Sequence, residues 1–323
     1  MSVLIFVENW DGKFKKLSFE LVSYGARVAE MAGTEAVVLS AGKVDAAELD
    51  KLGKYGARRI LNAAAPESGL ADSRYIATLI KAAVIQEKAS VVVLSDNNTG
   101  KAVAPRLSVN LKAGMGAGVN QLPESISPFI VRKKVFSGNA FARIEMKSEI
   151  KIITLAQNSF ELIETEGHAS VAGFSPGITT ENPNLSVIEV QKQSGKVLLN
   201  DAEIVVSGGR GMKSGDNWGP ILELANLLGA ATACSRPVSD EGWRPHDEHT
   251  GQTGKIIAPN LYIAIGISGA TQHLAGVSSS KYIVAINTDK DAPIFSAAQY
   301  GIVGDASKIL PKLVAAVREM KAK

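Results

Sequence analysis

The chain has 323 residues, of which 46% are hydrophobic and 21% are charged, and its formal net charge is +3. This length suffices for two domains with separate cores, and the composition is typical of a soluble globular protein. So small a net charge, without basic clusters interleaved with aromatic residues, argues against a nucleic-acid-binding protein. The single cysteine, Cys234, excludes an internal disulfide and a cysteine-based metal or iron–sulfur site, and we expect it to be buried.

The first residues, MSVLIFVENWDG, predict a strand. They lack the basic leader and the long apolar region of a secretory signal, and they are not a transit segment rich in arginine and serine. No apolar run reaches the roughly 18 residues that a membrane span needs. We therefore expect a cytoplasmic protein.

The N-terminal half alternates between predicted strands and predicted helices. Asp72 is the expected cap of the third helix, and Pro105 is expected to kink the fourth or delay its start. Such alternation indicates βαβ units around a parallel sheet. Strands are expected at residues 3–7, 36–39, 59–61 and 90–94, and helices at 17–31, 45–52, 73–87 and 99–111.

The turn at 96–101 lies where parallel sheets bind ligands, beyond the carboxyl end of a strand. It could be the remnant of a nucleotide pocket, but helix capping by Asn98 or Thr99 explains the same composition. Both interpretations stay open. Three glycines within 114–118 then predict a loose stretch of chain.

After residue 122 the pattern changes. Apolar runs at 129–136 and 140–146 flank Ser137-Gly138-Asn139, which predicts a hairpin, and 151–155 adds a third run with no helix between. We expect antiparallel strands appended to the parallel sheet. The stretch 158–183 predicts a connector in which His168 is exposed, and residues 187–190 are expected to form the last strand of the first domain.

The second domain is predicted to be another parallel sheet with helices. Its first strand, 201–206, runs into Ser-Gly-Gly-Arg-Gly, which is not the G-x-G-x-x-G fingerprint of a standard NAD pocket. Further strands are expected at 230–233, 261–265, 282–286 and 302–303, and helices at 218–228, 271–275 and 308–320. Because the carboxyl ends of parallel strands share one edge, the polar residues after them should converge on one crevice that suits a dinucleotide. These residues are Arg210, Arg236, Ser268, Asn287 and Asp305.

Two glycine-rich stretches in this domain suit a phosphate. The strand 261–265, the turn 266–270 and the following helix start form a nest of free N–H groups, with Ser268 at the expected cap position. The loop 251–255 ends in Gly-Lys, as a Walker A motif does. That motif also needs a glycine five residues earlier, at position 249, and this residue is histidine. This loop could supply a hydroxyl and N–H groups to a ligand, or be an ordinary polar turn.

His246 and His249 raise the possibility of a zinc site. They form an i, i+3 pair with two carboxylates between them, but Pro245 and the lack of a further convincing ligand argue against it. We expect a solvated loop.

Six segments resemble the flavin-binding region of the electron transfer flavoprotein α subunit: 207–211, 234–237, 251–255, 266–276, 286–289 and 300–305. The resemblance spans roughly residues 200 to 310 and is looser in the N-terminal half, mainly at 98–106. It implies an α/β fold with two parallel-sheet domains. Residues 1–190 would form a β-subunit-contacting domain with appended antiparallel strands, and 195–323 a doubly wound FAD-binding domain.

The resemblance also implies roles for individual residues around FAD. It places Arg236 over the ring system, His273 at the N1–C2=O edge, Thr253 at N5 and Gln252 beside the ring. It places Arg210 and Ser268 near the pyrophosphate, and Asn287 and Asp305 at the adenosine end. The full set of expected cofactor-binding residues is Arg210, Ser235, Arg236, Gln252, Thr253, Gly254, Ser268, Gly269, Ala270, Gln272, His273, Asn287 and Asp305.

The activity implied is that of an electron carrier without substrate chemistry of its own. It would take electrons from flavin dehydrogenases, such as the acyl-CoA dehydrogenases of fatty acid β-oxidation, and pass them to a membrane quinone oxidoreductase. An anionic semiquinone would form, because Arg236 and His273 suit the negative charge that develops at the ring. The implied partner is a β subunit in a heterodimer, with AMP as a candidate ligand of that subunit. The alternatives are a bifurcating or nitrogen-fixation type, with a second flavin in the β subunit, and a non-redox nucleotide-binding module.

Overall fold

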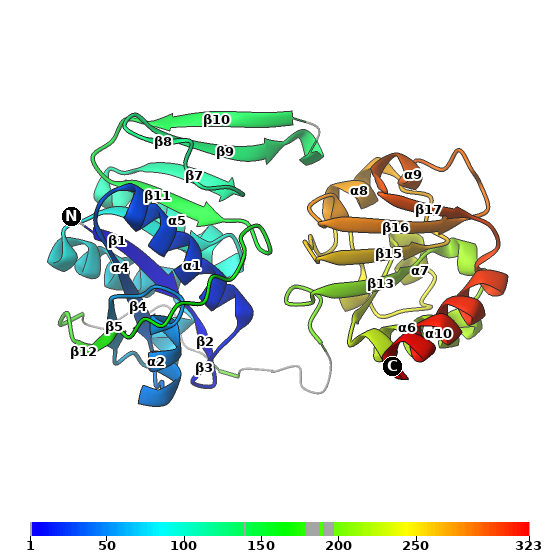
Figure 1. Ribbon diagram of the computed structural model, residues 1–323, viewed down its shortest axis with the longest axis horizontal. Coiled ribbons are helices and arrows are strands. Elements are labelled where there is room, and N and C mark those ends of the chain that lie inside the picture. Colours follow the sequence, from blue (N-terminus) through cyan, green and yellow to red (C-terminus); the bar gives the residue numbers. More distant parts are fainter. Residues whose placement is uncertain (1, 139, 179–187, 190–196, 323) are drawn as a thin grey trace. The chain divides into compact units, whose positions relative to one another are not determined.

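The computed structural model describes residues 2–138, 140–178, 188–189 and 197–322 (Figure 1). The chain divides into two compact units, the first formed mainly by residues 1–190 and the second mainly by residues 191–323. Each contains a mostly or wholly parallel sheet covered by helices. No helix in the described residues is long and apolar enough to cross a membrane.

The first unit is built on a sheet with the strand order β10-β9-β7-β11-β6-β1-β4-β5-β12, and β8 (Ser125–Ile126) pairs with β9. The short strands β2 (Asn9–Trp10) and β3 (Lys13–Phe14) pair separately. The strands of the large sheet are β1 (Ser2–Val7), β4 (Glu35–Ala41), β5 (Arg59–Ala63), β6 (Ala89–Ser95), β7 (Gly114–Val119), β9 (Phe129–Val135), β10 (Ala140–Met146), β11 (Lys151–Leu155) and β12 (Ser170–Phe174).

Helices cover both faces of this sheet, which explains why β1 is apolar without alternation and buried at all six positions. One core cluster joins the sheet to α1 (Lys16–Met31) and α2 (Ala46–Gly53). The other joins it to α4 (Ser73–Glu87) and α5 (Asn98–Leu111), with the short α3 (Glu67–Leu70) before them. The predicted βαβ organisation is confirmed.

The predicted start of α4 is confirmed, since the Asp72 carboxylate accepts a hydrogen bond from the Arg74 N–H at 2.8 Å. The cap of α5 lies one residue earlier than predicted. Asn97, rather than Asn98 or Thr99, accepts from the Gly100 N–H at 2.9 Å. The Asn97 amide in turn donates to the Glu8 carboxylate at 2.7 Å. The polar groups at this strand end are therefore paired with one another, which favours the capping interpretation over a nucleotide pocket.

The hairpin is confirmed, because β9 and β10 pair antiparallel from Ala140↔Val135 to Met146↔Phe129. Two neighbouring predictions were wrong. The glycine stretch forms β7, whose small residues allow close packing: a Cβ on Gly116 would lie 2.9 Å from the Val131 side chain. The run 151–155 forms β11, which is parallel and lies between β6 and β7. The hairpin is therefore inserted between two parallel strands, because the chain next forms β11 in the parallel part of the sheet.

The connector prediction missed β12, which pairs in parallel with β5 at the sheet edge. Four of its five residues are exposed, so it lacks the apolar pattern of a buried strand. His168 is exposed as predicted. For the strand expected at 187–190, the structure describes only residues 188 and 189, which are not in a strand, and residues 187 and 190 lie outside the described part of the chain.

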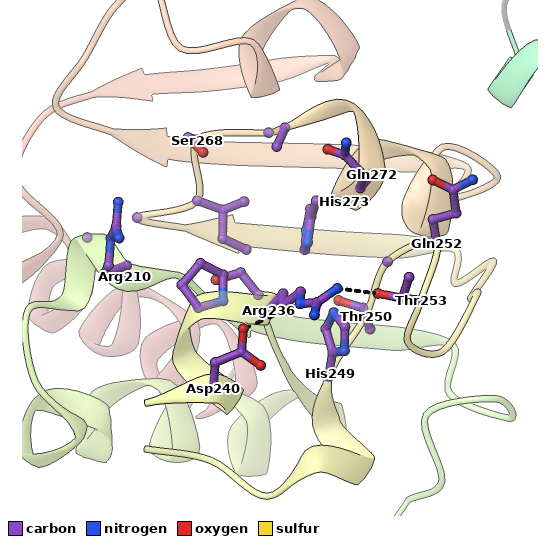
Figure 2. Close-up of a pocket in the computed structure, with 18 of the residues that line it drawn as sticks. Arg210, Arg236, Asp240, His249, Thr250, Gln252, Thr253, Ser268, Gln272 and His273 are labelled. Carbon is purple, nitrogen blue, oxygen red and sulfur yellow. Dashed lines mark hydrogen bonds and ion pairs between the residues drawn. The ribbon is translucent and has the colours of Figure 1, made fainter. Parts of the chain in front are cut away.

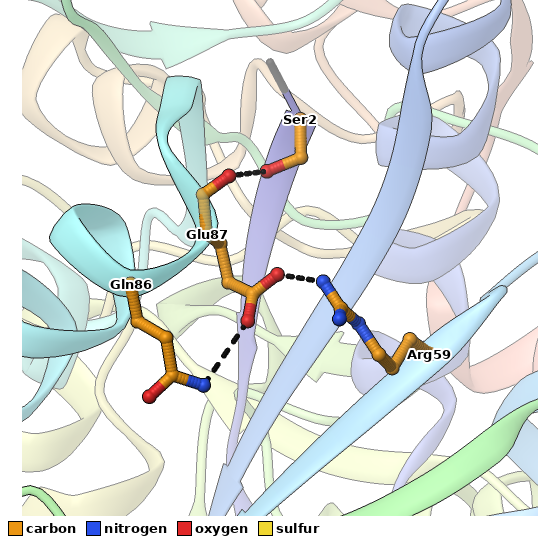
Figure 3. Close-up of polar contacts among 4 residues, drawn as sticks. All are labelled: Ser2, Arg59, Gln86 and Glu87. Carbon is orange, nitrogen blue, oxygen red and sulfur yellow. Dashed lines mark hydrogen bonds and ion pairs between the residues drawn. The ribbon is translucent and has the colours of Figure 1, made fainter.

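A polar cluster ties the end of α4 to two strand starts (Figure 3). The Glu87 carboxylate forms an ion pair with Arg59 and accepts from the Gln86 amide at 3.2 Å. The Ser2 hydroxyl donates to the Glu87 carbonyl at 3.1 Å. Because the Glu87 side chain is only 3% exposed, its charge needs these partners, and the cluster holds α4 in register with the sheet.

The second unit has an all-parallel sheet with the order β14-β13-β15-β16-β17. The chain moves from β13 to β14 and then crosses to β15 on the other side, so a topological switch point lies between β13 and β15. Ligands bind beyond the carboxyl ends of strands at such a point. The strands are β13 (Ile204–Gly208), β14 (Ala231–Cys234), β15 (Leu261–Ile265), β16 (Tyr282–Asn287) and β17 (Tyr300–Val303).

Helices α6 (Gly219–Leu228) and α10 (Ala306–Ala322) pack on one face of this sheet, and α8 (Thr271–Val277) and α9 (Ile294–Ala297) on the other. This confirms a doubly wound domain. The short α7 (Arg236–Asp240) was not predicted. The cap of α8 is Ala270 rather than Ser268, because Gly269, which lies between them with a φ of +83°, keeps the chain out of the helical conformation.

Candidate functional site

A cavity of about 560 Å³ lies at the carboxyl ends of the strands in the second unit (Figure 2). Its size is within the range of small-molecule and cofactor sites. The residues that line it are Arg210, Gly211, Ser235, Arg236, Pro237, Asp240, His249, Thr250, Gly251, Gln252, Thr253, Gly266, Ile267, Ser268, Gly269, Ala270, Gln272, His273 and Asn287.

Eleven of the thirteen residues expected from the sequence line this cavity, and Gly254 and Asp305 do not. Asp305 directly precedes α10, and its carboxylate accepts hydrogen bonds from the Ser307 N–H at 2.9 Å and from the Ser307 hydroxyl at 2.8 Å. These hydrogen bonds lower the pKa of Asp305. A Cβ on Gly254 would lie 2.5 Å from the His249 carbonyl oxygen. In the structure, Gly254 therefore lets the loop close over His249.

Glycines bring two strand ends together without side chains between them. A Cβ on Gly209 would lie 2.2 Å from the Gly266 carbonyl oxygen, and the Gly211 N–H donates to that oxygen at 3.0 Å. Gly266 has a φ of +63°, which disfavours other residues. Gly211 and Gly266 line the cavity between Arg210 and Ser268, and neither has a side chain that would separate a ligand from the backbone.

Arg236 is held from two sides (Figure 2). Its Nε lies 3.3 Å from the carboxylate of Asp240, one turn later on α7, and Nη1 lies 3.4 Å from the Thr253 hydroxyl. Its side chain is still 63% exposed, so the guanidinium remains available to a ligand. Asp240 was missed in the sequence analysis, although its i, i+4 spacing from Arg236 on a short helix was a usable signal.

His273 is 7% exposed, and its Nε2 lies 2.8 Å from the Tyr262 hydroxyl. Burial lowers its pKa to about 4, although the Thr250 backbone acts in the opposite direction. The imidazole is therefore neutral at pH 7. Its Nδ1 is buried without a hydrogen-bond partner among the described residues.

The expectation of a solvated loop was wrong for His249, which is 3% exposed and lines the cavity, whereas His246 is exposed. A partly buried bidentate ion pair between Arg244 and Glu248, at 2.8 and 2.6 Å, holds this loop in place. Burial lowers the pKa of His249. The i, i+4 spacing of Arg244 and Glu248 was the available signal. No group of three or more metal-ligating side chains occurs in the described residues.

Cys234 is fully buried, as predicted, at the end of β14. Burial raises the pKa of its thiol to about 12, so the thiol stays protonated. The cavity therefore combines two arginines, hydroxyls, a glycine cradle and an unpartnered imidazole nitrogen. This donor set fits a dinucleotide that carries a pyrophosphate and a ring able to accept hydrogen bonds.

Comparison with known proteins identifies the family. Residues 3–178 match the model of the electron transfer flavoprotein domain, and residues 198–278 match that of the electron transfer flavoprotein FAD-binding domain. The chain belongs to the electron transfer flavoprotein α-subunit family. Its cofactor is FAD, and the FAD-binding match includes every residue that lines the cavity except Asn287. Family membership decides against a non-redox nucleotide-binding module.

The similarity to known electron transfer flavoproteins extends over nearly the whole chain. The α subunit of Syntrophomonas wolfei is 36% identical, with 98% of each chain covered. That of Pseudomonas aeruginosa is also 36% identical, with 98% of this chain and all of the relative covered. Protein FixB of Clostridium saccharobutylicum is 31% identical, with 98% of this chain and 96% of the relative covered.

Proposed function

We propose that this electron transfer subunit takes electrons from flavin dehydrogenases, such as acyl-CoA dehydrogenases, and delivers them to a quinone oxidoreductase at the membrane. The observation that supports this function best is the cavity at the switch point of a domain matched as FAD-binding. Bound FAD supplies the one-electron chemistry. The chain's own residues bind it, orient it and stabilise negative charge near its ring.

The ring end of FAD would lie between α7 and α8. We propose that Arg236 provides a permanent positive charge there and that neutral His273 donates a hydrogen bond at the N1–C2=O edge. Thr253 would contact N5, and Gln252 would lie beside the ring. Both belong to a loop tied to α8, since the Gln252 N–H donates to the Gln272 carbonyl at 2.7 Å. This hydrogen bond supports a fixed position for the loop.

The phosphate end would lie over the glycines at the ends of β13 and β15, which are Gly209, Gly211 and Gly266. We propose that Arg210 and Ser268 bind the pyrophosphate, together with the backbone at Gly269 and Ala270. Asn287 and Asp305 are the proposed residues at the adenosine end. The Asn287 amide donates to the Ile267 carbonyl at 2.8 Å, which fixes the turn that carries Ser268. Ser235, Gly254 and Gln272 complete the proposed set.

The proposed partner is a β subunit. The appended hairpin β9–β10 supports this, because β10 is the edge of the sheet, exposes Phe141 at 45% and needs a neighbour or a cover. We expect co-expression to yield a 1:1 heterodimer, and the chain alone to be poorly soluble or depleted of FAD. Sizing with light scattering tests this expectation. A monodisperse α monomer with a full complement of FAD would contradict it.

The electron route is tested by mixing the heterodimer with a reduced acyl-CoA dehydrogenase in a stopped-flow instrument. We expect the flavin absorbance of the heterodimer to bleach, and to recover when the quinone oxidoreductase is added. No bleaching with any flavin dehydrogenase of the same organism would remove the proposed donor class.

The similarity to Protein FixB supports a second candidate, a bifurcating or nitrogen-fixation type. Its β subunit would carry a second flavin instead of AMP. Two flavins per heterodimer would favour this candidate, and one flavin with AMP would favour the first.

A further inference from the structure

A buried hydrogen bond joins β15 to α8 beside the cavity. The phenol oxygen of Tyr262 lies 2.8 Å from Nε2 of His273. Tyr262 is fully buried, and His273 is 7% exposed. His273 lines the cavity, whereas Tyr262 does not. Any effect of Tyr262 on a bound cofactor therefore passes through His273.

The direction of this hydrogen bond follows from the other neighbours of the phenol. The Thr250 hydroxyl donates to the Cys234 carbonyl at 3.3 Å. The Ser207 hydroxyl approaches the phenol oxygen without completing a hydrogen bond. In the described residues, Nε2 of His273 is the atom that lies at hydrogen-bond distance from the phenol oxygen, and a buried hydroxyl without an acceptor is unfavourable. We infer from this that Tyr262 is the donor.

This direction fixes the tautomer of His273. A neutral imidazole carries one proton, so if Nε2 accepts from Tyr262 the proton of His273 is on Nδ1. That nitrogen completes no hydrogen bond within the described residues, although the Thr250 backbone lies close enough to the ring to raise its pKa. Free histidine prefers the opposite tautomer, with its proton on Nε2. The Tyr262 hydroxyl therefore selects the less common form.

The surroundings also keep the ring neutral. Burial lowers the pKa of His273, the Thr250 backbone raises it and His249 lowers it further. The charged groups that line the cavity are Arg236 and Asp240 from α7 and Arg210 after β13. Cys234, on β14, faces the Tyr262 phenol, and both carry raised pKa values because they are buried.

We propose that Tyr262 is a positioning residue: by donating to Nε2 it holds His273 neutral with its proton on Nδ1, so that His273 gives FAD a fixed hydrogen bond and takes up no proton when FAD is reduced. This inference rests on the proposed function, because it needs FAD in the cavity with His273 at its ring.

Nitrogen-15 NMR of histidine side chains reads the tautomer directly, and the chain has only 4 histidines. In the FAD-loaded heterodimer, the His273 signal can be identified by its loss in His273→Gln. We expect this signal to show the Nδ1–H form and to stay unchanged between about pH 6 and pH 8, the range in which an ordinary histidine titrates. A signal of the Nε2–H form, or one that titrates in this range, would overturn the proposal. This test uses the wild-type protein and does not depend on the folding of a variant.

Tyr262→Phe removes the donor and retains the ring. We expect the Nε2–H form to appear and the His273 signal to begin to titrate. The first one-electron potential should be independent of pH in the wild type. In the variant it should rise as pH falls, with a slope of up to about 59 mV per pH unit, which corresponds to one proton per electron. A variant with the wild-type tautomer and no slope would contradict the proposal.

Tyr24→Phe is the matched control. Tyr24 is also fully buried, and its hydroxyl donates to the Gln121 carbonyl at 3.1 Å in the first unit. We expect its loss to leave the His273 tautomer and the slope of the potential unchanged. Equilibrium dialysis against FAD distinguishes failure of the proposed function from failure of the inference about Tyr262. If the wild type retains no FAD, the proposed function fails as well; if it binds FAD but His273 is in the Nε2–H form, only this inference fails.

Discussion

Gly276→Ala will displace the 251–255 loop and weaken FAD binding by up to about 30-fold. A Cβ on Gly276 would lie 2.5 Å from the Gly251 Cα, and 2.6 Å from its nitrogen. These are backbone atoms, so the loop that carries Gln252 and Thr253 has to move. Such overpacking costs about 1–3 kcal/mol, and the roughly 1 kcal/mol that alanine gains over glycine inside a helix offsets part of it, which leaves a net cost of up to about 2 kcal/mol. The measurements are FAD affinity by equilibrium dialysis and the thermal midpoint with and without FAD.

Gly219→Ala is the control for this substitution. Gly219 is also in a helix of the second unit, but a Cβ there would have nothing within 4 Å. We expect wild-type FAD affinity and a thermal midpoint that is unchanged or slightly higher. If Gly276→Ala binds FAD as tightly as Gly219→Ala, the contact between α8 and the loop does not shape the site.

Arg236→Ala will lower the first one-electron potential of bound FAD by about 60–130 mV while FAD stays bound. The substitution deletes a permanent charge beside the ring, and a hydrogen bond to a charged group contributes about 1.5–3 kcal/mol. At about 59 mV per tenfold change, this free energy corresponds to the stated shift. The half-reduced flavin should then accumulate less during a dithionite titration monitored by absorbance.

Two further variants sharpen this test. Arg236→Lys should recover only part of the loss, because an ammonium group cannot lie flat against a ring as a guanidinium does. Asp240→Asn should shift the potential in the opposite direction, because it removes the carboxylate that lies 3.3 Å from Nε of Arg236. If Arg236→Ala and Asp240→Asn both leave the potential unchanged, the positive charge that stabilises the reduced ring lies elsewhere, and the β subunit is the next place to look.

The convergence of the site could be predicted because it depends on local features. Arg210, Arg236 and Ser268 each follow a strand that the sequence marks clearly, and parallel strands place their carboxyl ends at one edge. Strand partners were harder to predict. The apolar residues of β11 would suit an antiparallel strand next to the hairpin equally well. β11 is parallel because it pairs with β6 and β7, which lie far from it in the sequence. Local sequence does not encode that choice.

Burial of polar residues was the other feature that the sequence concealed. His249 belongs to a polar segment whose composition is the same as that of a solvated loop. The partly buried ion pair of Arg244 with Glu248 holds this segment in place, and a favourable pair of this kind depends on geometry that spacing alone does not supply. The hydrogen bond between Tyr262 and His273 was concealed for the same reason, since its donor belongs to an apolar strand.

The most direct test of the central claim, that the cavity of the second unit holds FAD, is equilibrium dialysis of FAD against Arg210→Ala and Ser268→Ala. Each loses a proposed contact with the pyrophosphate and should bind FAD about 10- to 150-fold more weakly, with the flavin absorbance spectrum unchanged because the ring is not touched. Arg27→Ala, which removes an exposed arginine of the first unit, should retain wild-type affinity. Unchanged FAD affinity in both cavity variants would contradict the account.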